Sequence, residues 1–495
     1  MPQLLASLVL GALLPLAFAP FEAWWLAPLL IAGHMPLWVG AAPRAAFWRG
    51  FAFGGGAFLT GTYWLYHSVV VIGQVPIALA MLLVLGMVAI MAVYFGLNCW
   101  LLRRWFGTSP AMILILLPFL WVWTEWLRGW VLSGFPWLTL GSSLPESPLS
   151  GWLPLGGVYL GSFVLVALAA ALYGLILPGR AQQVAVATLV ALAAASAGLH
   201  DRQWTVETGE TLSVRIGQLG QDQRLKWRQE EFQATLQWYA RFVVDSEPVD
   251  LLLMPEVAIP ALAQNVRAYL AQLGQVAAAR QQTVVLGILN QPENQDPANA
   301  MLALSGGQQQ WYEKRHLVPF GEFFPVPGFI RDWMRLRGLP YANIRAGDPA
   351  PSPIRIGDQL AAASICYEDA YAAEQLVFFP DATFIINISN DAWFGDTIAP
   401  HQHLQIARAR SLESQRWQAR STNTGISALI DSQGAVRAQA PAFEPATLQG
   451  TLTMRTGHTP FTRVGNLPLL LFSLLVIIGA AIVRRRRETG LTSAE

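Results

Sequence analysis

The sequence predicts a polytopic α-helical membrane domain joined to one large α/β domain that lies in water. Hydrophobic residues make up 54% of the 495 residues and charged residues only 13%. An ordinary soluble chain is nearer to one quarter charged, so part of this chain must be solvated by lipid. The apolar residues gather in runs before residue 200 and near the C-terminus, whereas the stretch between them has a mixed composition.

Eight apolar runs are each close to the roughly 20 residues that a helix needs to cross a bilayer. Seven precede the α/β domain and one follows it. They cover residues 3–20, 24–43, 52–73, 76–101, 111–128, 155–178, 182–199 and 467–483. We therefore expect a membrane domain over 1–200, an α/β domain over 201–465, an eighth transmembrane helix over 466–484 and a tail over 485–495.

The first run could instead be a cleaved signal peptide, because Ala17-Phe18-Ala19 resembles a cleavage site. Signal peptides usually carry a basic side chain near the N-terminus, and Met1-Pro2-Gln3 has none. We therefore expect this run to remain as a membrane span.

Arginines near the span ends predict the orientation, because cytoplasmic loops carry an excess of basic residues. Loops on one side of the predicted membrane hold Arg44, Arg49, Arg103, Arg104 and Arg180, and residues 484–487 are arginines too. Among the short loops on the other side, only the one after the fifth span has an arginine, Arg128. We expect both termini in the cytoplasm and residues 201–465 outside it.

Net charge and cysteine content bear on partners and cofactors. A formal net charge of +1 offers no basic face for nucleic acid. The two cysteines are Cys99, in an apolar run, and Cys366, in a mixed segment, so a disulfide between them is not expected. No cysteine pair has metal-ligand spacing. We expect no nucleic-acid partner, no metal and no cofactor.

Residues 201–465 alternate short β-rich runs with amphipathic stretches, which is typical of an α/β layered domain. Expected strands cover 211–218, 250–254, 283–289, 360–365, 383–388 and 425–431, and expected helices cover 230–244, 266–280 and 403–416. In α/β sheets, ligands bind beyond the carboxyl ends of the strands.

Polar segments that follow strands of this domain contain Glu256, Lys314 and Cys366, which together could perform acyl transfer. A cysteine attacks as the thiolate, and Glu256 is a candidate base for its proton. Lys314 could stabilise the thiolate and the oxyanion of a tetrahedral intermediate, with the backbone N–H of Tyr367 as a second donor. Taken singly, each residue is more often structural, and a lone cysteine after a strand is most often a small buried hydrophobe.

The segments around these residues resemble the active-site motifs of the carbon–nitrogen hydrolase, or nitrilase, superfamily. The matching stretches are Pro255-Glu256, Lys314 to Glu322, Cys366-Tyr367-Glu368-Asp369, Asn387 to Gly395, His403 to Arg410 and Asn423 to Ser427. With seven spans before this domain and one after it, the chain over nearly its full length resembles the apolipoprotein N-acyltransferase family of the Gram-negative inner membrane. The resemblance implies a periplasmic, nitrilase-like α-β-β-α sandwich on an eight-helix membrane base.

The resemblance also implies roles for individual residues. Glu256, Lys314 and Cys366 match the catalytic triad, while the supporting or substrate-binding positions match Glu322, Tyr367, Glu368 and Trp227. For Trp227 the alternative is a side chain that covers apolar core. One departure stands at Glu413-Ser414-Gln415-Arg416, where a Glu-x-Gly-Arg motif is expected, so Gln415 could alter a local turn.

The reaction that the resemblance implies is ping-pong. Cys366 takes an acyl chain from a phospholipid, usually the sn-1 chain of phosphatidylethanolamine, and releases a lysophospholipid. The α-amine of a diacylglyceryl-cysteine at the N-terminus of an apolipoprotein then attacks the thioester. Both substrates keep acyl chains in the bilayer, which explains why the enzyme is membrane-embedded. We expect a monomer.

Two other functions remain open from the sequence. A membrane-tethered amidase or nitrilase would use the same triad with water as acceptor, and would differ in not protecting its thioester. A transporter or receptor could carry an inactive nitrilase-like domain, although transport paths usually show intramembrane charge and these spans hold few ionisable residues.

A lipid entrance is expected at residues 320–339, directly after the Lys314 motif. Phe323, Phe324 and Trp333 are the residues singled out there, in a segment that also holds arginines able to meet lipid phosphates. The alternative is that these aromatics pack against the core of their own domain.

Overall fold

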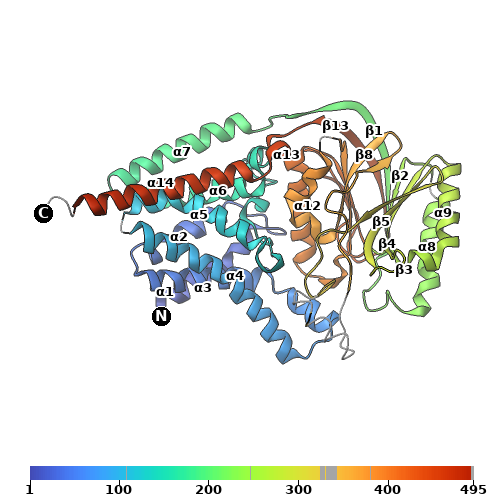
Figure 1. Ribbon diagram of the computed structural model, residues 1–495, viewed down its shortest axis with the longest axis horizontal. Coiled ribbons are helices and arrows are strands. Elements are labelled where there is room, and N and C mark those ends of the chain that lie inside the picture. The colour runs from blue at the N-terminus through green and yellow to red at the C-terminus, as the bar shows by residue number, and fades with distance from the viewer. Residues whose placement is uncertain (108, 246, 324–328, 330–342, 380, 492–495) are drawn as a thin grey trace. The chain divides into compact units, whose positions relative to one another are not determined.

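The computed structural model describes residues 1–107, 109–245, 247–323, 329, 343–379 and 381–491. The chain divides into two compact units (Figure 1). The helical unit comprises Met1–Arg202 and Val464–Glu495, and the α/β unit comprises Gln203–Arg463.

The helical unit is built from apolar helices, several of which begin with proline. Its main helices are α1 (Pro2–Leu13), α2 (Leu26–Trp38), α3 (Pro43–Gly61), α4 (Ile77–Phe106), α5 (Pro110–Arg128), α6 (Leu153–Gly174), α7 (Arg180–Leu199) and α14 (Leu467–Leu491). Proline is favoured in the first turn because its missing N–H would have no partner there. Pro43 and Pro110 begin α3 and α5 in this way.

Five helices of the described chain are long and apolar enough to cross a membrane, namely Ile77–Phe106, Pro110–Arg128, Ser150–Gly174, Arg180–Leu199 and Leu467–Arg485. Pro2–Ala17 and Leu26–Trp38 are apolar but shorter. A membrane protein is therefore supported, whereas the expected number of eight spans is not reached by length and composition. The third run also differs in position, because α3 begins at Pro43 and ends at Gly61 rather than covering 52–73.

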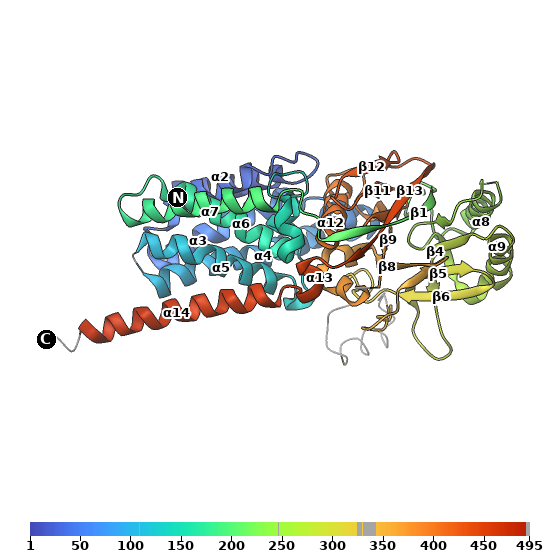
Figure 2. The same ribbon diagram turned by 90° about the horizontal axis from the view of Figure 1, so that it is seen from above.

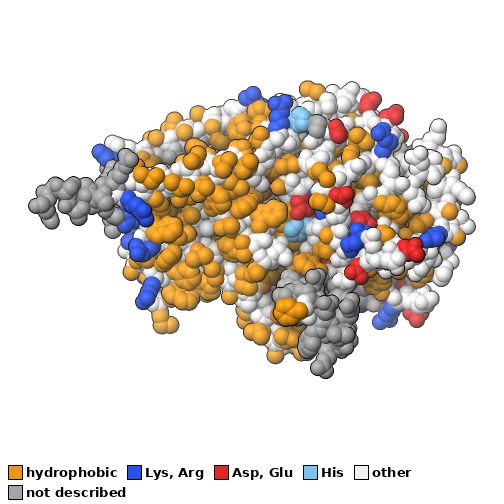
Figure 3. Space-filling model, viewed as in Figure 1, with side chains coloured by type: hydrophobic (Ala, Val, Ile, Leu, Met, Phe, Trp, Pro, Cys, Tyr) orange, Lys and Arg blue, Asp and Glu red, His pale blue; other side chains and the backbone are white. Residues whose placement is uncertain are grey.

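The surface of the helical unit is dominated by hydrophobic side chains (Figure 3). On α4 and α14, Leu82 and Leu475 are 68% and 67% exposed. Inside the unit, glycine permits close helix contact, since a Cβ at Gly56 of α3 would lie 2.1 Å from the carbonyl oxygen of Leu8 in α1. Small residues at helix contacts and apolar residues outside are what a lipid solvent favours.

The α/β unit contains two sheets. The first has the order β13-β1-β2-β4-β5-β6, with β3 paired to β4, and the second has the order β12-β11-β10-β9-β8-β7. The first sheet is formed by β1 (Thr205–Gln218), β2 (Leu251–Leu253), β3 (Ile259–Leu262), β4 (Thr283–Asn290), β5 (Ala298–Ser305), β6 (Gln308–Glu313) and β13 (Ala446–Gly457). The second is formed by β7 (Ile354–Ile356), β8 (Gln359–Ile365), β9 (Phe384–Ser389), β10 (Gln418–Thr422), β11 (Ala428–Ile430) and β12 (Val436–Gln439).

The two sheets lie face to face with helices outside them (Figure 2). Buried side chains from both sheets form the central core, among them Leu253 and Ile386. The helices α8 (Gln229–Val244) and α9 (Arg267–Ala279) pack on the first sheet, and α12 (Ala399–Ser414) lies on the second. The expected α/β domain with layered sheets is confirmed.

Parallel strand pairs bring two predicted site segments to the ends of strands. β2 runs parallel to β1 and β4, and β8 runs parallel to β9. Glu256 follows the end of β2, and Cys366 follows β8 directly.

Gly287 of β4 lies against the backbone that carries Glu256. Its N–H donates to the carbonyl of Pro255 at 3.1 Å. A Cβ at position 287 would lie 2.4 Å from the nitrogen of Val257 and 2.7 Å from the Cα of Glu256. Only a residue without a side chain allows this approach. Gly287 therefore lets the backbone of Glu256 pack directly against β4.

We expect Gly287→Ala to lower the free energy of unfolding by about 1–3 kcal/mol, because the added methyl must displace packed backbone. Gly274→Ala in α9 is the matched control, since a Cβ there meets nothing within 4 Å. Alanine in a helix is favoured over glycine by roughly 1 kcal/mol, so the control should be neutral or stabilising. Thermal unfolding of the two full-length variants in detergent checks this, and equal midpoints would contradict it.

Candidate active site

Lys314 is the centre of a buried ionic cluster. It follows β6, and its backbone N–H donates to the carbonyl of Asn299 on β5 at 2.8 Å. Its ammonium lies 3.3 Å from Oε1 of Glu256 and 3.0 Å from Oε1 of Glu322. The Lys314 side chain is only 1% exposed. The structure therefore brings together the expected base, the expected cation and the second glutamate.

The charge of Lys314 is held by its two carboxylate partners. Burial by itself lowers the pKa of this ammonium, but Glu256 and Glu322 more than offset it and raise the pKa above its ordinary value. Lys314 is therefore a fixed positive charge at neutral pH.

Cys366 stands at a strained turn between β8 and a short 3-10 helix, η7 (Cys366–Ala370). Its φ is +53°, a region that non-glycine residues rarely adopt and that often marks functional sites. Burial, and after it the charge of Glu256, raises the pKa of the thiol, while Lys314 opposes the rise. A raised pKa favours the thiol over the thiolate, so nucleophilic attack needs a base to accept the proton.

Glu368 accepts hydrogen bonds from both the turn of Cys366 and the segment that contains Lys314. Its Oε2 accepts hydrogen bonds from the N–H of Ile365 at 2.7 Å and from the hydroxyl of Tyr312 at 2.8 Å. Its Oε1 accepts one from the N–H of Arg315 at 2.7 Å. Burial raises the pKa of Glu368 to about 7, although these donors counteract it. The carboxylate therefore joins β8 to the end of β6.

A second buried network, made of charged and polar side chains, contacts the backbone of Cys366. Asp369 and Asp391 both bind the guanidinium of Arg420, at 3.0 and 3.3 Å. Asp391 contacts Nδ1 of His403 at 2.7 Å, and Nε2 of His403 faces the carbonyl oxygen of Cys366 at 3.2 Å. The His403 ring therefore connects the carboxylate of Asp391 to the backbone of Cys366.

The other predicted residues lie in different settings. Tyr367 is buried and its ring meets His316 and Tyr371. Trp227 is 56% exposed, so it does not cover apolar core. Phe323 is half-buried and its backbone pairs with Pro319. Phe324 and Trp333, with most of the expected lipid entrance, fall outside the described residues.

Sequence reasoning assigned no role to some residues of the cluster. Asn299 donates to Glu256 and Glu322 from β5, and nothing in its local sequence marks it. Lys226, one of only two lysines in the chain, donates to the backbone carbonyl of Glu256 at 3.1 Å. Burial lowers the pKa of Lys226 to about 8, although the negative charge of Glu256 acts to raise it. The rarity of lysine was the available signal for Lys226.

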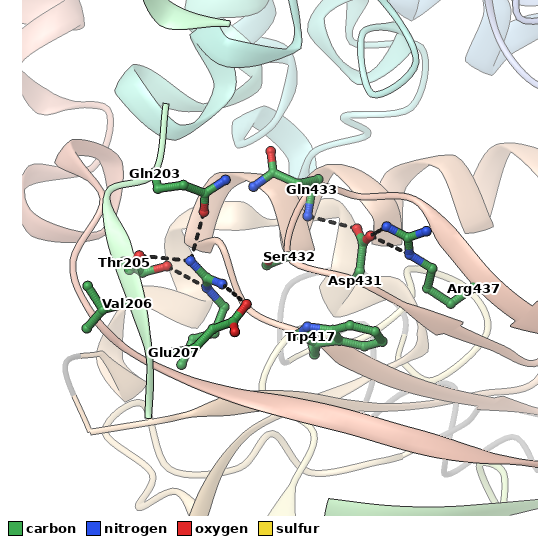
Figure 4. Close-up of a pocket in the computed structure, with 10 residues that line it drawn as sticks. Gln203, Thr205, Val206, Glu207, Trp417, Asp431, Ser432, Gln433 and Arg437 are labelled. Atoms are coloured by element: carbon green, nitrogen blue, oxygen red, sulfur yellow. Dashed lines mark hydrogen bonds and ion pairs between the residues drawn. The ribbon is translucent and has the colours of Figure 1, made fainter. Parts of the chain in front are cut away.

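An open pocket of about 490 Å³ lies elsewhere in the α/β unit, beside the start of β1 (Figure 4). Glu256, Lys314 and Cys366 do not line it. Its charged groups pair with one another, Arg437 with Asp431 and Arg455 with Glu207. In the part of the chain that the structure describes, no group of three or more His, Cys, Asp or Glu residues could hold a metal ion.

Comparisons with known proteins agree with the division into two parts. Residues 10–171 match the apolipoprotein N-acyltransferase N-terminal domain, and residues 213–459 match the carbon-nitrogen hydrolase family. Among solved structures, the carbon-nitrogen hydrolase from Helicobacter pylori G27 is 12% identical with a TM-score of 0.38, and covers 56% of this chain and 96% of its own. That likeness is too low to carry an argument.

Full-length relatives are much closer. The apolipoprotein N-acyltransferase of Azotobacter vinelandii is 38% identical, covering 98% of this chain and 96% of the relative. The enzyme of the same name from Chromobacterium violaceum is 36% identical, covering 98% of this chain and 94% of the relative. Identity at this level over both parts of the molecule shows that the chain belongs to the apolipoprotein N-acyltransferase family.

Proposed function

We propose that this protein transfers a fatty acyl chain from a phospholipid, through a thioester on Cys366, to the α-amine of the N-terminal diacylglyceryl-cysteine of apolipoproteins. The observation that carries the proposal is the buried cluster of Glu256, Lys314 and Glu322, next to a cysteine on a strained turn. The names of the full-length relatives indicate the substrates, and phosphatidylethanolamine is the donor we favour.

In the first half-reaction, Glu256 accepts the proton of the Cys366 thiol as sulfur attacks the ester carbonyl of the phospholipid. The tetrahedral oxyanion is held by the ammonium of Lys314 and by the backbone N–H of Tyr367. When the C–O bond breaks, Glu256 returns the proton to the leaving alkoxide, so a lysophospholipid departs and the acyl chain stays on sulfur.

In the second half-reaction, the neutral α-amine of the lipoprotein attacks the thioester carbonyl. The same two donors hold the oxyanion, the C–S bond breaks, and the proton lost by nitrogen passes through Glu256 to the sulfur of Cys366. The products are an amide and the free thiol. The enzyme is thus ready for another phospholipid without any cofactor.

Aminolysis rather than hydrolysis requires that water be kept from the thioester. Cys366 is 8% exposed, and Glu256 and Lys314 are buried too. A closed site with apolar helices in the same chain suits two substrates whose acyl chains stay in a bilayer. A nitrilase that acts on small soluble amides would have no need of such helices.

We further propose that the protein lies in the Gram-negative inner membrane with seven spans before the catalytic domain and one after it. The arginine distribution supports cytoplasmic termini and, with them, a periplasmic α/β unit. We expect the enzyme to act as a monomer, with Glu322, Glu368, Tyr367 and Trp227 supporting the site or binding substrate. Phe323, Phe324 and Trp333 remain our candidates for the lipid entrance.

Cys366→Ala is expected to abolish acyl transfer, because the thioester of the proposed mechanism forms on the sulfur of Cys366. Cys99→Ala is the matched control, since Cys99 is a buried thiol of the helical unit. Intact mass after incubation with phospholipid checks the prediction: one acyl chain should appear on the parent and on Cys99→Ala. An acylated Cys366→Ala protein would overturn the mechanism.

Glu368→Gln is expected to slow thioester formation by about 100-fold, because small misplacements of reacting groups cost this much. The amide nitrogen of glutamine would face a backbone N–H, and each donor left unpaired costs roughly 1–3 kcal/mol. Glu374→Gln is a suitable control, because Glu374 pairs with His316 at 2.7 Å without holding the Cys366 turn. Both rates are measured by intact mass on samples quenched at set times. Similar rates for the two variants would count against this role of Glu368.

Reporter fusions test the orientation. Fusions after Arg104 and Arg180 should report the cytoplasm, and fusions within residues 210–460 should report the periplasm, because the arginine-bearing loops stay inside. Paired alkaline phosphatase and green fluorescent protein fusions at each site give opposite readouts. A cytoplasmic signal from 210–460 would refute the proposed compartment.

A further inference from the structure

Asn299 holds both carboxylates of the site at the same oxygens that Lys314 contacts. Its amide nitrogen donates to Oε1 of Glu256 at 2.6 Å and to Oε1 of Glu322 at 2.9 Å. Its own backbone carbonyl accepts the N–H of Lys314 at 2.8 Å. One residue of β5 thus fixes the cation, the base and the second glutamate.

The orientation of this amide follows from its partners. Carboxylate oxygens only accept hydrogen bonds when ionised, so the amide atom facing them must be the NH₂ group. Both of its hydrogens are then used, one on each glutamate. The remaining atom, Oδ1 of Asn299, is a carbonyl oxygen and can only accept.

That oxygen has no partner among the described residues. Oδ1 of Asn299 is buried and makes no hydrogen bond there, and the residue is only 4% exposed. A buried acceptor without a donor costs free energy, so its presence beside the ionic cluster needs an explanation. Since both heteroatoms belong to one planar amide, this acceptor lies at the edge of the Glu256–Lys314–Glu322 cluster.

We infer that Asn299 is a positioning residue for both half-reactions and a determinant of the amine acceptor. Its NH₂ group pins one oxygen of Glu256 beside Lys314 and leaves the other oxygen, Oε2, to take the proton of Cys366. Its Oδ1 accepts one N–H of the incoming amine, which directs the nitrogen lone pair at the thioester carbon. This inference rests on the proposed function.

In the second step the neutral primary amine has two N–H groups. One donates to Oδ1 of Asn299, and the other supplies the proton that passes to Glu256 as the C–N bond forms and the C–S bond breaks. A thiol acceptor offers only a weak S–H donor, and this single hydrogen must go to the base. Asn299 therefore favours amines over thiols.

The matched control is Asn290 on the neighbouring strand β4. It also donates from its side-chain amide to a glutamate, Oε1 of Glu313, at 2.9 Å. This bond goes to Glu313 rather than to Glu256, Lys314 or Cys366. Asn299→Ala and Asn290→Ala each remove one such amide from the same sheet, so a general weakening of the sheet would affect both.

The first measurement is the rate of thioester formation on Cys366 from phosphatidylethanolamine in mixed micelles. The rate is measured by intact mass at pH values from about 5 to 9. Asn299→Ala should slow it by about 100-fold. The acid limb of its pH profile should also move to higher pH, because losing donors favours the protonated carboxylates. Asn290→Ala should match the parent.

Failure of the proposed function and failure of the positioning role of Asn299 give different results. If the parent forms no thioester, the proposed function fails. If the parent forms it and Asn299→Ala does so at the same rate with the same pH profile, the positioning role fails. If Asn299→Ala does not fold, Asn299→Ser, with a smaller polar side chain, is measured in its place under the same criteria.

The second measurement starts from preformed acyl-enzyme and compares two acceptors, a diacylated lipopeptide amine and the small thiol N-acetylcysteamine. Loss of the NH₂ clamp alone should slow both transfers equally. Loss of Oδ1 should also lower the ratio of aminolysis to thiolysis, by about 10-fold for one hydrogen bond of roughly 1.4 kcal/mol. An unchanged ratio would overturn the assignment of Oδ1 to the amine.

Discussion

The structure of the site depends on one buried ammonium shared between two carboxylates. Charges taken out of water cost several kcal/mol each unless they are paired and hydrogen-bonded. Lys314 meets this condition with Glu256 and Glu322, while Asn299 satisfies the same oxygens. Removing Lys314 would leave two buried carboxylates without their cation. Function and local stability are therefore tied to the same contacts.

Two further sets of polar groups in the α/β unit fix the position of Cys366, the proposed nucleophile, relative to this cluster. Cys366 directly follows β8 of the second sheet, and Lys314 directly follows β6 of the first. Apolar packing between the sheets alone would not fix the position of one residue relative to the other. Glu368 supplies the cross-link, since it binds backbone N–H groups on both sides. The chain from Arg420 through Asp391 to His403 then holds the carbonyl of Cys366. Hydrogen bonds, which are directional, thus fix the position of Cys366 relative to Lys314, which apolar packing alone would not fix.

The sequence predicted elements well where periodicity was strong. The amphipathic stretch 230–244 became α8 (Gln229–Val244). The helix expected at 403–416 instead spans Ala399–Ser414, because it is buried on nearly all faces and shows no amphipathic pattern. It ends where Gln415 takes a φ of +48°. Gln415 compensates for the missing glycine by accepting the N–H of Trp204 at 2.7 Å.

The site was predictable only where residues lie in recognisable motifs. Glu256, Lys314, Glu322 and Cys366 stand in such segments. Asn299 does not, because its place in the site comes from the antiparallel pairing of β5 with β6, where Ala300 faces Glu313. Contacts created by strand register leave no trace in a local window of sequence.

The raised pKa of Lys314 would also protect the proposed thioester from attack by the enzyme's own amine. A thioester near a neutral amine is prone to acyl migration from sulfur to nitrogen, which would end turnover with a stable amide. Glu256 and Glu322 keep the ammonium protonated, and a protonated nitrogen has no lone pair with which to attack. The chain's other lysine, Lys226, is 3% exposed and points its nitrogen at a backbone carbonyl. With the proposed thioester on Cys366, the chain would thus offer no exposed lysine amine to take up the acyl group.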